Sequence, residues 1–207
     1  MQQLIEKSRF GLASKAFFEM SAKDILDDEE LGYLERSCDE IPKEIIEIGD
    51  VGESNRLAVG RFMEDKKGEV PVYRNDPVGK AVVDILSSGK CKEFFSGIMG
   101  GEYFIRRCQS NILDEGCFIG KHIDTYSNFE YKYSVVVQFG KDYEGGEFFV
   151  DYEGKEYVTK TSYLDVLVNK CEVPHGVRAV TEGKRTSLVF FLSKSPLGQA
   201  NLINKQI

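Results

Sequence analysis

The hydrophobic pattern divides the chain into two parts. From residue 103 onward, short apolar or alternating segments recur at regular intervals, with turn-forming residues between them. Segments of this length and spacing predict antiparallel strands in a sandwich or jelly roll, and not a parallel α/β sheet. The predicted strands span Tyr103–Leu113, Cys117–Asp124, Tyr131–Phe139, Glu147–Tyr152, Lys155–Lys160, Leu164–Val168, Glu172–Val180 and Arg185–Ser193.

The first hundred residues carry helical periodicity instead. Ser21, with an acidic residue three positions later, resembles a capping box and predicts that a helical region begins there. Apolar side chains at helical spacing predict a helix over residues 27–38. Two more helices are predicted over residues 76–86 and 92–98, because glycine follows each segment closely.

The segment between the first two predicted helices is mixed. Residues 45–48 indicate an extended segment, and Asp65–Glu69 indicates an exposed turn. Some later strands, such as residues 188–192, are apolar on both faces, so they need a second sheet on one side and helices on the other. The pattern therefore predicts a mostly β fold with flanking α-helices.

The chain shows no internal repeat, low-complexity tract or clear linker, so we expect a single domain of residues 1–207. Within it, residues 103–193 should form a jelly-roll core. Residues 1–102 should form a helical and mixed buttress packed on one sheet, and residues 194–207 a C-terminal tail.

Composition narrows the classes of function. The 207 residues (23.4 kDa) carry 27 basic and 34 acidic side chains, which gives a net charge of −7 and a pI near 5.1. This balance argues against binding to nucleic acid or to an anionic membrane surface, because both need clustered lysine and arginine. No apolar run is long enough to span a membrane, and the first residues lack the apolar core of a signal peptide. Five cysteines without framework spacing predict reduced thiols in a cytoplasmic protein.

Only two histidines occur in the chain, His122 and His175. His122 and Asp124 are separated by one residue in a predicted strand, so both side chains should lie on one face with their Cα atoms about 7 Å apart. An imidazole and a carboxylate at this spacing can bind one metal ion. His175 lies at the end of another predicted strand, which can return beside the first in an antiparallel double sheet. Two histidines and one carboxylate form the facial triad of non-haem Fe(II) oxygenases.

A zinc site is the alternative interpretation of these residues. Cys117 with His122, and Cys171 with His175, would supply a Cys2His2 set of ligands. In a strand, however, the five-residue offset places Cys117 and His122 on opposite faces. Because this site would also leave Asp124 without a role, the sequence favours the triad.

A second group of residues indicates an anion site. Arg185 and Ser187 share one face of the last predicted strand. A guanidinium beside a hydroxyl suits a carboxylate, because arginine binds it through two parallel hydrogen bonds and stays charged when buried. An anion site close to a metal implies an acidic cosubstrate that bridges the two. Arg178 is the competing arginine, although its position favours the mouth of the site or solvent.

Taken in order, these residues resemble the Fe(II)- and 2-oxoglutarate-dependent dioxygenases, and the nearest branch is the prolyl-4-hydroxylase-like one. The resemblance covers residues 103–192 and rests on His122-x-Asp124, His175 and Arg185-x-Ser187, with Gly145-Gly146-Glu147-Phe148 between them. It implies a double-stranded β-helix core, which is a cupin-like jelly roll. It also implies that His122, Asp124 and His175 bind Fe(II), and that Arg185 and Ser187 bind the far carboxylate of 2-oxoglutarate.

The resemblance further implies the reaction. Such an enzyme consumes O2 and 2-oxoglutarate, releases succinate and CO2, and hydroxylates an unactivated C–H bond of its substrate, with ascorbate as a candidate reductant. Halogenating relatives carry a small residue in place of the carboxylate ligand. Because Asp124 is present, the resemblance favours hydroxylation.

One feature of many relatives is absent. They place a tyrosine on the strand before the HxD motif, where it contacts the cosubstrate, but here that neighbourhood holds Asn111, Ile112 and Leu113. Several polar residues are candidates to replace the tyrosine, and the sequence does not choose among them: Gln109, Tyr131, Tyr133 and Gln138.

The predicted substrate is a free amino acid, another small metabolite or a residue of a protein. A short chain without an evident peptide-binding insertion favours a small molecule. The aromatic stretch Thr125–Glu130, directly after Asp124, is a candidate substrate-covering loop. The alternative function is a catalytically silent, cupin-like module that binds a metal or ligand or acts as a sensor. Arg185 with Ser187 favours the enzyme, and the sequence does not indicate an oligomeric state.

Overall fold

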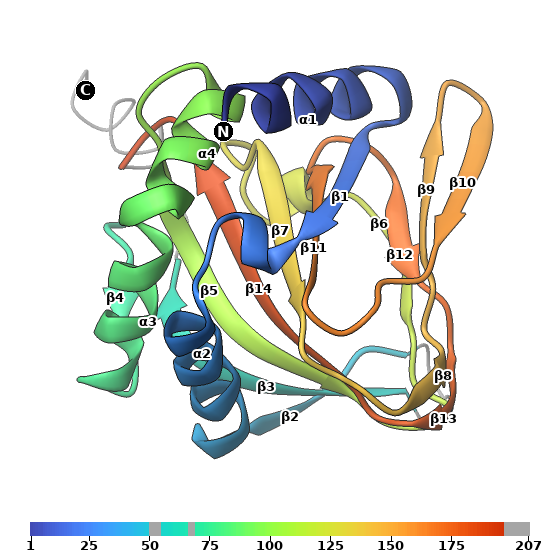
Figure 1. The fold of residues 1–207 in the computed structure, drawn as a ribbon. Coiled ribbons are helices and arrows are strands. Elements are labelled where there is room, and N and C mark those ends of the chain that lie inside the picture. The colour runs from blue at the N-terminus through green and yellow to red at the C-terminus, as the bar shows by residue number, and fades with distance from the viewer. Residues whose placement is uncertain (50–54, 66–68, 197–207) are drawn as a thin grey trace, which may run out of the picture.

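Two antiparallel sheets form the centre of the fold (Figure 1). The computed structural model describes residues 1–49, 55–65 and 69–196. The larger sheet consists, in spatial order, of β1 (Phe17–Ser21), β11 (Asp165–Lys170), β7 (Tyr133–Gln138), β14 (Arg185–Ser193), β5 (Phe104–Leu113), β3 (Arg56–Glu64) and β2 (Glu44–Glu47), with β4 (Val72–Tyr73) beside β3.

A smaller sheet faces the larger one across a pocket. It consists of β10 (Lys155–Thr159), β9 (Phe148–Tyr152), β12 (His175–Val177) and β6 (Ile119–His122), and a separate ribbon pairs β13 (Val180–Gly183) with β8 (Tyr143–Gly145). The expected double-stranded β-helix fold is confirmed. At the two sides of the larger sheet, β1 joins β11 and β3 joins β5, so the first hundred residues supply strands as well as helices.

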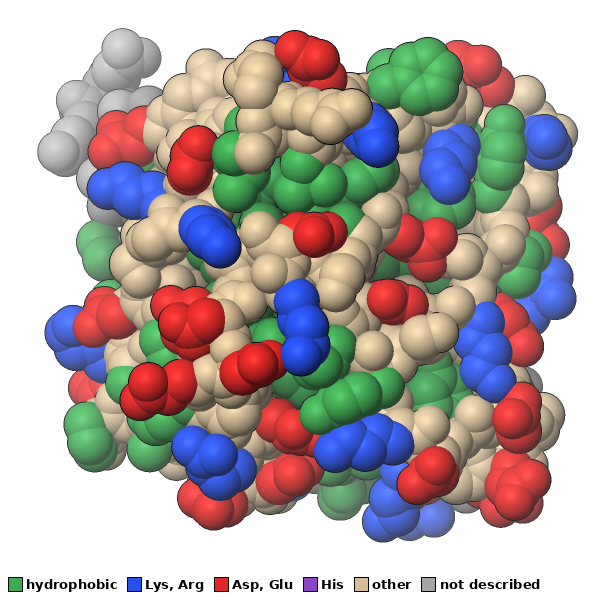
Figure 2. Space-filling model, in the orientation of Figure 1, with side chains coloured by type: hydrophobic (Ala, Val, Ile, Leu, Met, Phe, Trp, Pro, Cys, Tyr) green, Lys and Arg blue, Asp and Glu red, His purple; other side chains and the backbone are tan. Residues whose placement is uncertain are grey.

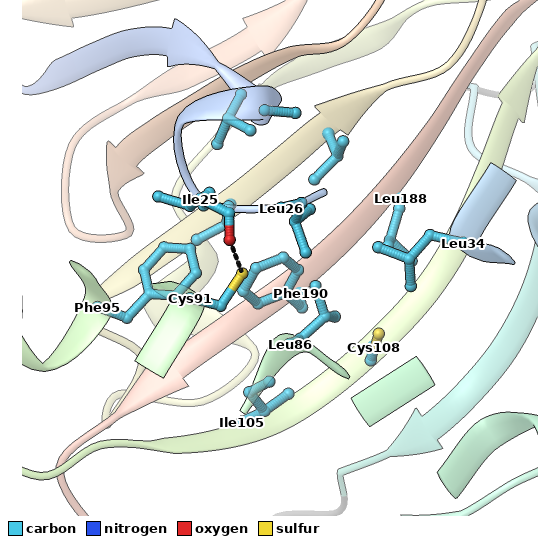
Figure 3. Close-up of a cluster of buried hydrophobic side chains, with 14 of the residues drawn as sticks. Ile25, Leu26, Leu34, Leu86, Cys91, Phe95, Ile105, Cys108, Leu188 and Phe190 are labelled. Atoms are coloured by element: carbon cyan, nitrogen blue, oxygen red, sulfur yellow. Dashed lines mark hydrogen bonds between the residues drawn. The ribbon is translucent and has the colours of Figure 1, made fainter. Parts of the chain in front are cut away.

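Within the described residues, four α-helices cover the other face of the larger sheet: α1 (Gln2–Lys15), α2 (Asp28–Glu40), α3 (Val78–Leu86) and α4 (Gly89–Met99). Figure 3 shows Leu34, Leu86 and Phe95, from three of these helices, directed toward β14. There they meet Leu188 and Phe190, both fully buried. The main apolar core therefore lies between the helices and the larger sheet.

The strands of the larger sheet alternate between this core and the pocket. On β14, Leu188 and Phe190 belong to the helix-side core, whereas Val189 and Phe191 line the pocket. This division follows from the period of two along a strand. The expectation of strands with an apolar face toward helices and another toward a second sheet is confirmed.

The helix boundaries differ from prediction at one point. Ser21 caps only a single 3-10 turn, by accepting a hydrogen bond from the Lys23 amide (3.3 Å). Asp27 caps α2 instead, in a reciprocal capping box with Glu30: the Glu30 amide donates to Asp27 Oδ1 (2.8 Å), and the Asp27 amide donates to Glu30 Oε2 (2.9 Å). The predicted later helices are confirmed as α3 and α4, within a few residues at each end.

Helix α1 is not predicted by the pattern, because its buried face is not purely apolar. Ser8 and Gly11 share that face with Ile5 and Leu12. Small residues are needed for the close approach to neighbouring elements: a Cβ at Gly11 would lie 3.0 Å from the Phe17 carbonyl oxygen. Hydrophobic periodicity is therefore weak where packing depends on small side chains.

All five cysteines are free and buried. Burial raises the pKa of Cys38 and of Cys91 to about 12. Since the thiolate is the reactive form, these side chains behave as small apolar groups of the core.

The surface carries mixed charge. Figure 2 shows acidic and basic side chains interspersed over one face of the molecule. No helix in the described ranges is long and apolar enough to cross a membrane.

Candidate active site

The two histidines lie on neighbouring strands of the smaller sheet. His122 is the last residue of β6, His175 is the first residue of β12, and the antiparallel register places them directly opposite each other. Their rings are 4.6 Å apart at the centroids. Ligand atoms of His122, Asp124 and His175 all lie within 4.8 Å of one another. The structure therefore contains the facial triad that the sequence predicts.

Asp124 reaches this cluster differently from the prediction. Strand β6 ends at His122, and Asp124 begins a 3-10 helix, η2 (Asp124–Tyr126), so the predicted strand over Cys117–Asp124 is too long. The Asp124 amide donates to the Cys171 carbonyl (2.9 Å), which holds the turn against the segment before β12. This contact places Oδ1 of Asp124 3.3 Å from His122 Nε2, and Oδ2 3.3 Å from His175 Nε2.

The hydrogen bonds of the imidazoles show that the site fits a metal ion. Nδ1 of His122 lies 2.9 Å from the Gly120 carbonyl, and Nδ1 of His175 lies 2.8 Å from the Val173 carbonyl. Because a carbonyl only accepts, each Nδ1 is the donor, and in the neutral ring Nε2 keeps its lone pair. Both lone pairs then face the Asp124 carboxylate, whose buried Oδ2 has no hydrogen-bond partner among the residues that the structure describes. A cation between these atoms satisfies all three groups.

Charge interactions at the triad agree with a cation site. Burial acts to raise the pKa of Asp124, but interactions with His122 and His175 outweigh it and hold the pKa well below its usual range. Burial likewise opposes a charge on His122, but Asp124 and the Gly120 carbonyl outweigh it and raise the pKa of this imidazole. Asp124 is thus ionised at neutral pH and attracts positive charge to this point.

The zinc alternative is wrong. Among the described residues, the group that can hold a metal contains the two histidines and Asp124 but neither cysteine. Cys117 packs in an apolar cluster with Leu113 and Val180, and Cys171 packs with aromatic side chains.

A pocket of about 470 Å³ connects the triad to the larger sheet. Polar side chains from four strands of that sheet line it on the inner face: Arg107, Gln109, Asn111, Ser134, Asn169, Arg185 and Ser187. Apolar side chains lie between them, among them Val136, Leu167, Val189 and Phe191. The volume and the mixture of a few polar groups with apolar walls are typical of a small-molecule site.

Arg185 and Ser187 line this pocket at the start of β14, and because both side chains are buried, this part of the pocket is called its closed end. Arg185 is only 4% exposed, and its Nη1 donates to Ser187 Oγ at 3.5 Å. Its Nε is buried and has no hydrogen-bond partner within the described ranges, and burial lowers the pKa of the guanidinium. A buried cation in this state favours an anion as ligand.

Gly146 explains why the glycine pair of the motif is needed here. Its φ is +65°, and a Cβ at this position would lie 3.0 Å from Arg185 Cδ. Any other residue would be strained in the left-handed conformation and would press on the arginine.

The structure distinguishes among the four candidates to replace the missing tyrosine. Gln109 lines the pocket, where its Nε2 donates to Asn111 Oδ1 (2.7 Å). Tyr131 donates instead to Asp65 (2.9 Å), and Gln138 bonds with Thr186 and Thr161. In the described part of the chain, the pocket wall includes neither of these two residues nor Tyr133.

The structure also locates two other features of the sequence analysis, Arg178 and the candidate substrate-covering loop. Arg178 is half exposed and pairs with Glu156 (2.8 Å), so it faces solvent as expected. In the stretch Thr125–Glu130, Asn128 and Glu130 are buried, whereas the Tyr126 side chain is 87% exposed. This stretch is therefore anchored at one end and open at the other.

A buried ionic network anchors the stretch Thr125–Glu130. Arg106 is fully buried and pairs with Asp65 (2.8 Å) and Glu130 (3.3 Å), and Asp65 also accepts from Asn128 Nδ2 (2.8 Å). The exposed turn expected at Asp65–Glu69 is wrong for Asp65, which is 8% exposed, and residues 66–68 lie outside the described residues. The network ties the end of β3 to the loop that follows Asp124.

Sequence reasoning overlooked several polar residues of the pocket. Arg107 of β5, Ser134 of β7 and Asn169 of β11 all face it, and Ser134 Oγ donates to Asn169 Oδ1 (2.8 Å). The available signal was polar residues at alternate positions of otherwise apolar strands.

Comparison with known proteins identifies the family. No protein-family model and no curated protein matches the sequence. Among solved structures, the chain is similar to an oxidoreductase of the 2OG-Fe(II) oxygenase family from Burkholderia pseudomallei, with 34% identity over 94% of this chain and 92% of that chain, and a TM-score of 0.89.

Two more distant structures share the fold. One is a prolyl hydroxylase from Trichoplax adhaerens in complex with a hypoxia-inducible factor peptide fragment (15% identity, 93% of this chain, 90% of that chain, TM-score 0.68). The other is the α-ketoglutarate-dependent epimerase SnoN of nogalamycin biosynthesis (11% identity, 93% and 83%, TM-score 0.67). The likeness to the Burkholderia protein spans nearly the whole of both chains, and the triad is intact. This chain belongs to the 2OG-Fe(II) oxygenase family.

Proposed function

We propose that this oxygenase hydroxylates an unactivated C–H bond of a free amino acid or other small metabolite, with a protein residue as the second class of substrate. The observation that carries the proposal is that one pocket contains both the triad and Arg185, a buried arginine that forms no ion pair with any described residue. Fe(II), 2-oxoglutarate and O2 are the reagents of the family.

In this proposal His122, Asp124 and His175 hold Fe(II). The iron, when bound, supplies O2 activation coupled to decarboxylation of 2-oxoglutarate to succinate and CO2. The protein contributes fixed ligands: backbone carbonyls orient both imidazoles, and the Cys171 carbonyl fixes the turn that carries Asp124.

Arg185 and Ser187 bind the far carboxylate of 2-oxoglutarate. A carboxylate at this position accepts hydrogen bonds from the guanidinium and the hydroxyl, and it neutralises a buried charge. Gln109 and Asn111 lie further along the same wall, with Asn111 opposite Ser187 in the sheet register. We assign this amide pair the cosubstrate contact that a tyrosine makes in many relatives.

Hydroxylation is favoured over halogenation because Asp124 occupies the position of the carboxylate ligand. Epimerisation is the second candidate outcome, because the fold also occurs in the epimerase SnoN. The two outcomes differ in mass: hydroxylation adds one oxygen atom from O2 to the substrate, and epimerisation leaves its mass unchanged.

The pocket favours a small molecule over a peptide. Its volume of about 470 Å³ lies within the range typical of small-ligand sites. The cytoplasmic location and a need for ascorbate stay predictions from the sequence.

The first test is binding. Anaerobic titration of the Fe(II) protein with 2-oxoglutarate should produce a weak visible charge-transfer band, because the cosubstrate chelates the iron. A protein that binds iron but gives no band at saturating cosubstrate would contradict the proposal and favour the silent binding module.

The second test is turnover. A succinate-release screen over free amino acids, other small carboxylic acids and peptides should identify a substrate class, and mass spectrometry under 18O2 should show one labelled oxygen in the product. A product of unchanged mass would replace hydroxylation by epimerisation.

A further inference from the structure

We propose that Arg107 binds a carboxylate of the substrate, so that the substrates of this oxygenase are carboxylic acids. This inference rests on the proposed function, which requires the pocket to hold a substrate as well as 2-oxoglutarate. It is carried by a second arginine that faces the same pocket far from Arg185 and that has no anionic partner in the described part of the chain.

The two arginines are too far apart to serve one cosubstrate. In the β5–β14 ladder Arg185 lies opposite Leu113, and Arg107 lies opposite Phe191. Positions 107 and 113 of a strand are about 20 Å apart along its axis. A five-carbon dicarboxylate held at Arg185 and chelated to the metal does not reach Arg107, so the second cation is left for a different anion.

Arg107 lies on the triad side of the pocket. Its guanidinium carbon is 5.5 Å from the ring centroid of Phe191 and 5.8 Å from that of Tyr131. These two rings pack with Cys171, whose carbonyl accepts the hydrogen bond of the Asp124 amide. A substrate group bound by Arg107 is therefore close to the metal ligands.

The two aromatic rings beside Arg107 are held in place by their packing and by a hydrogen bond. The rings of Tyr131 and Phe191 stack with a centroid distance of 4.6 Å, and both residues are buried. The Tyr131 hydroxyl donates to Asp65, which is itself held by Arg106. Aromatic faces attract a guanidinium but do not neutralise it, so the orientation of Arg107 is fixed while its charge stays available.

The neighbouring arginine shows how a buried guanidinium is neutralised elsewhere in this protein. Arg106, the preceding residue, pairs with two buried carboxylates. Among the described residues, Arg107 forms no ion pair, and its Nε is buried without a hydrogen-bond partner. Lys121, another cation of the pocket wall, is already paired with Asp151 (2.9 Å). Arg107 is therefore the cation of this half of the pocket that a ligand can neutralise, and its planar fork suits a carboxylate.

The test is a titration followed by NMR of the arginine Nε–H groups. The protein is loaded with Zn(II), which does not react with O2, and Arg107→Lys and Arg185→Lys variants assign the two signals. 2-Oxoglutarate is added first and should shift the Arg185 signal. Sodium propionate, added next, should shift the Arg107 signal with saturation, whereas the isosteric neutral propionamide should not.

Variants supply the magnitude. Arg107→Gln should weaken propionate binding by roughly tenfold to a hundredfold, because a charge-assisted pair is lost, and should change 2-oxoglutarate affinity by less than about twofold. Lys121→Gln is the matched control, with an expected change below about twofold for propionate, because Lys121 is already paired.

Four results would overturn the inference. One is a shift of the Arg107 signal by propionamide that is as strong as the shift by propionate. Another is the lack of any shift with a carboxylate. A third is a shift with inorganic phosphate but not with a carboxylate, which would indicate a phosphorylated substrate instead. A response of Arg107 to 2-oxoglutarate itself would also overturn it. If Arg185 fails to respond to 2-oxoglutarate while Arg107 still responds to propionate, the proposed function fails and this inference does not.

Discussion

The two ends of the pocket present the same side chain in opposite settings. At one end Arg185 is fully enclosed, with Ser187 beside it and Gly146 packed against its aliphatic stem. At the other end Arg107 is partly buried and lies against the aromatic rings of Tyr131 and Phe191.

The difference explains how each end would select the ligand proposed for it. An enclosed guanidinium accepts one anion of fixed size, as a constant cosubstrate requires. An arginine seated on aromatic faces keeps a charged fork beside an apolar surface, which suits a substrate with both a carboxylate and a hydrocarbon part. In this proposal the triad serves both ends, because the metal that it holds must bind the cosubstrate and lie beside the substrate.

The largest effect is expected at the triad itself. His175→Ala should abolish succinate formation, because it removes a side chain that binds the metal directly. The loss of activity should exceed the roughly hundredfold loss that is typical when a residue hydrogen-bonded to a metal ligand is replaced. Succinate release and iron content should be measured together. Retained turnover would remove His175 from the proposed metal ligands and would contradict the placement of the metal between the two ends of the pocket.

The next effect separates the ends. Arg185→Gln should raise the KM for 2-oxoglutarate by roughly tenfold to a hundredfold, because it removes a charge-assisted interaction, while iron affinity stays nearly constant. Arg178→Gln is the matched control and should leave this KM unchanged, because Arg178 pairs with Glu156 at the surface. An unaltered KM in Arg185→Gln would transfer the cosubstrate role away from the closed end.

A pH series tests the metal ligands apart from both arginines. Metal binding needs Nε2 of His122 without a proton, and Asp124 raises the pKa of this imidazole. Because His175 must also bind through an unprotonated Nε2, Fe(II) affinity should fall at least about tenfold per pH unit once the pH drops below the pKa of His122. Asp124, with its lowered pKa, stays ionised over this range and adds no slope. Anaerobic iron titration at several pH values provides the measurement, and a flat profile would contradict the assignment of His122.

The smallest effect concerns the packing of the closed end. Gly146→Ala should raise the KM for 2-oxoglutarate by about threefold to tenfold and destabilise the fold by about 1 kcal/mol, because it places a Cβ at positive φ against Arg185. Gly154→Ala has the same sign of φ with open space around it, so it should cost similar stability and leave KM unchanged. Equal KM effects in both variants would show that enclosure of Arg185 is unimportant.

Much of the fold and of the site was predictable from local patterns. Alternating strands after residue 103, helices with acidic or glycine boundaries, and the order of His122, Asp124, His175, Arg185 and Ser187 depend on residue type and spacing alone. Such features are readable because backbone periodicity fixes which side chains share a face before any tertiary contact forms.

Other features depended on contacts between distant segments. Asp124 reaches the metal site from a turn held by Cys171, and α1 forms a helix through small residues that fit its neighbours. Arg106 and Arg107 are identical and adjacent in the sequence, yet one is neutralised by Asp65 and Glu130 while the other faces the pocket. The ordered motif in the sequence thus indicated the family by resemblance, together with the candidate metal ligands. Tertiary structure alone decided which cations were already paired, because ion pairing depends on distances between segments far apart in the chain.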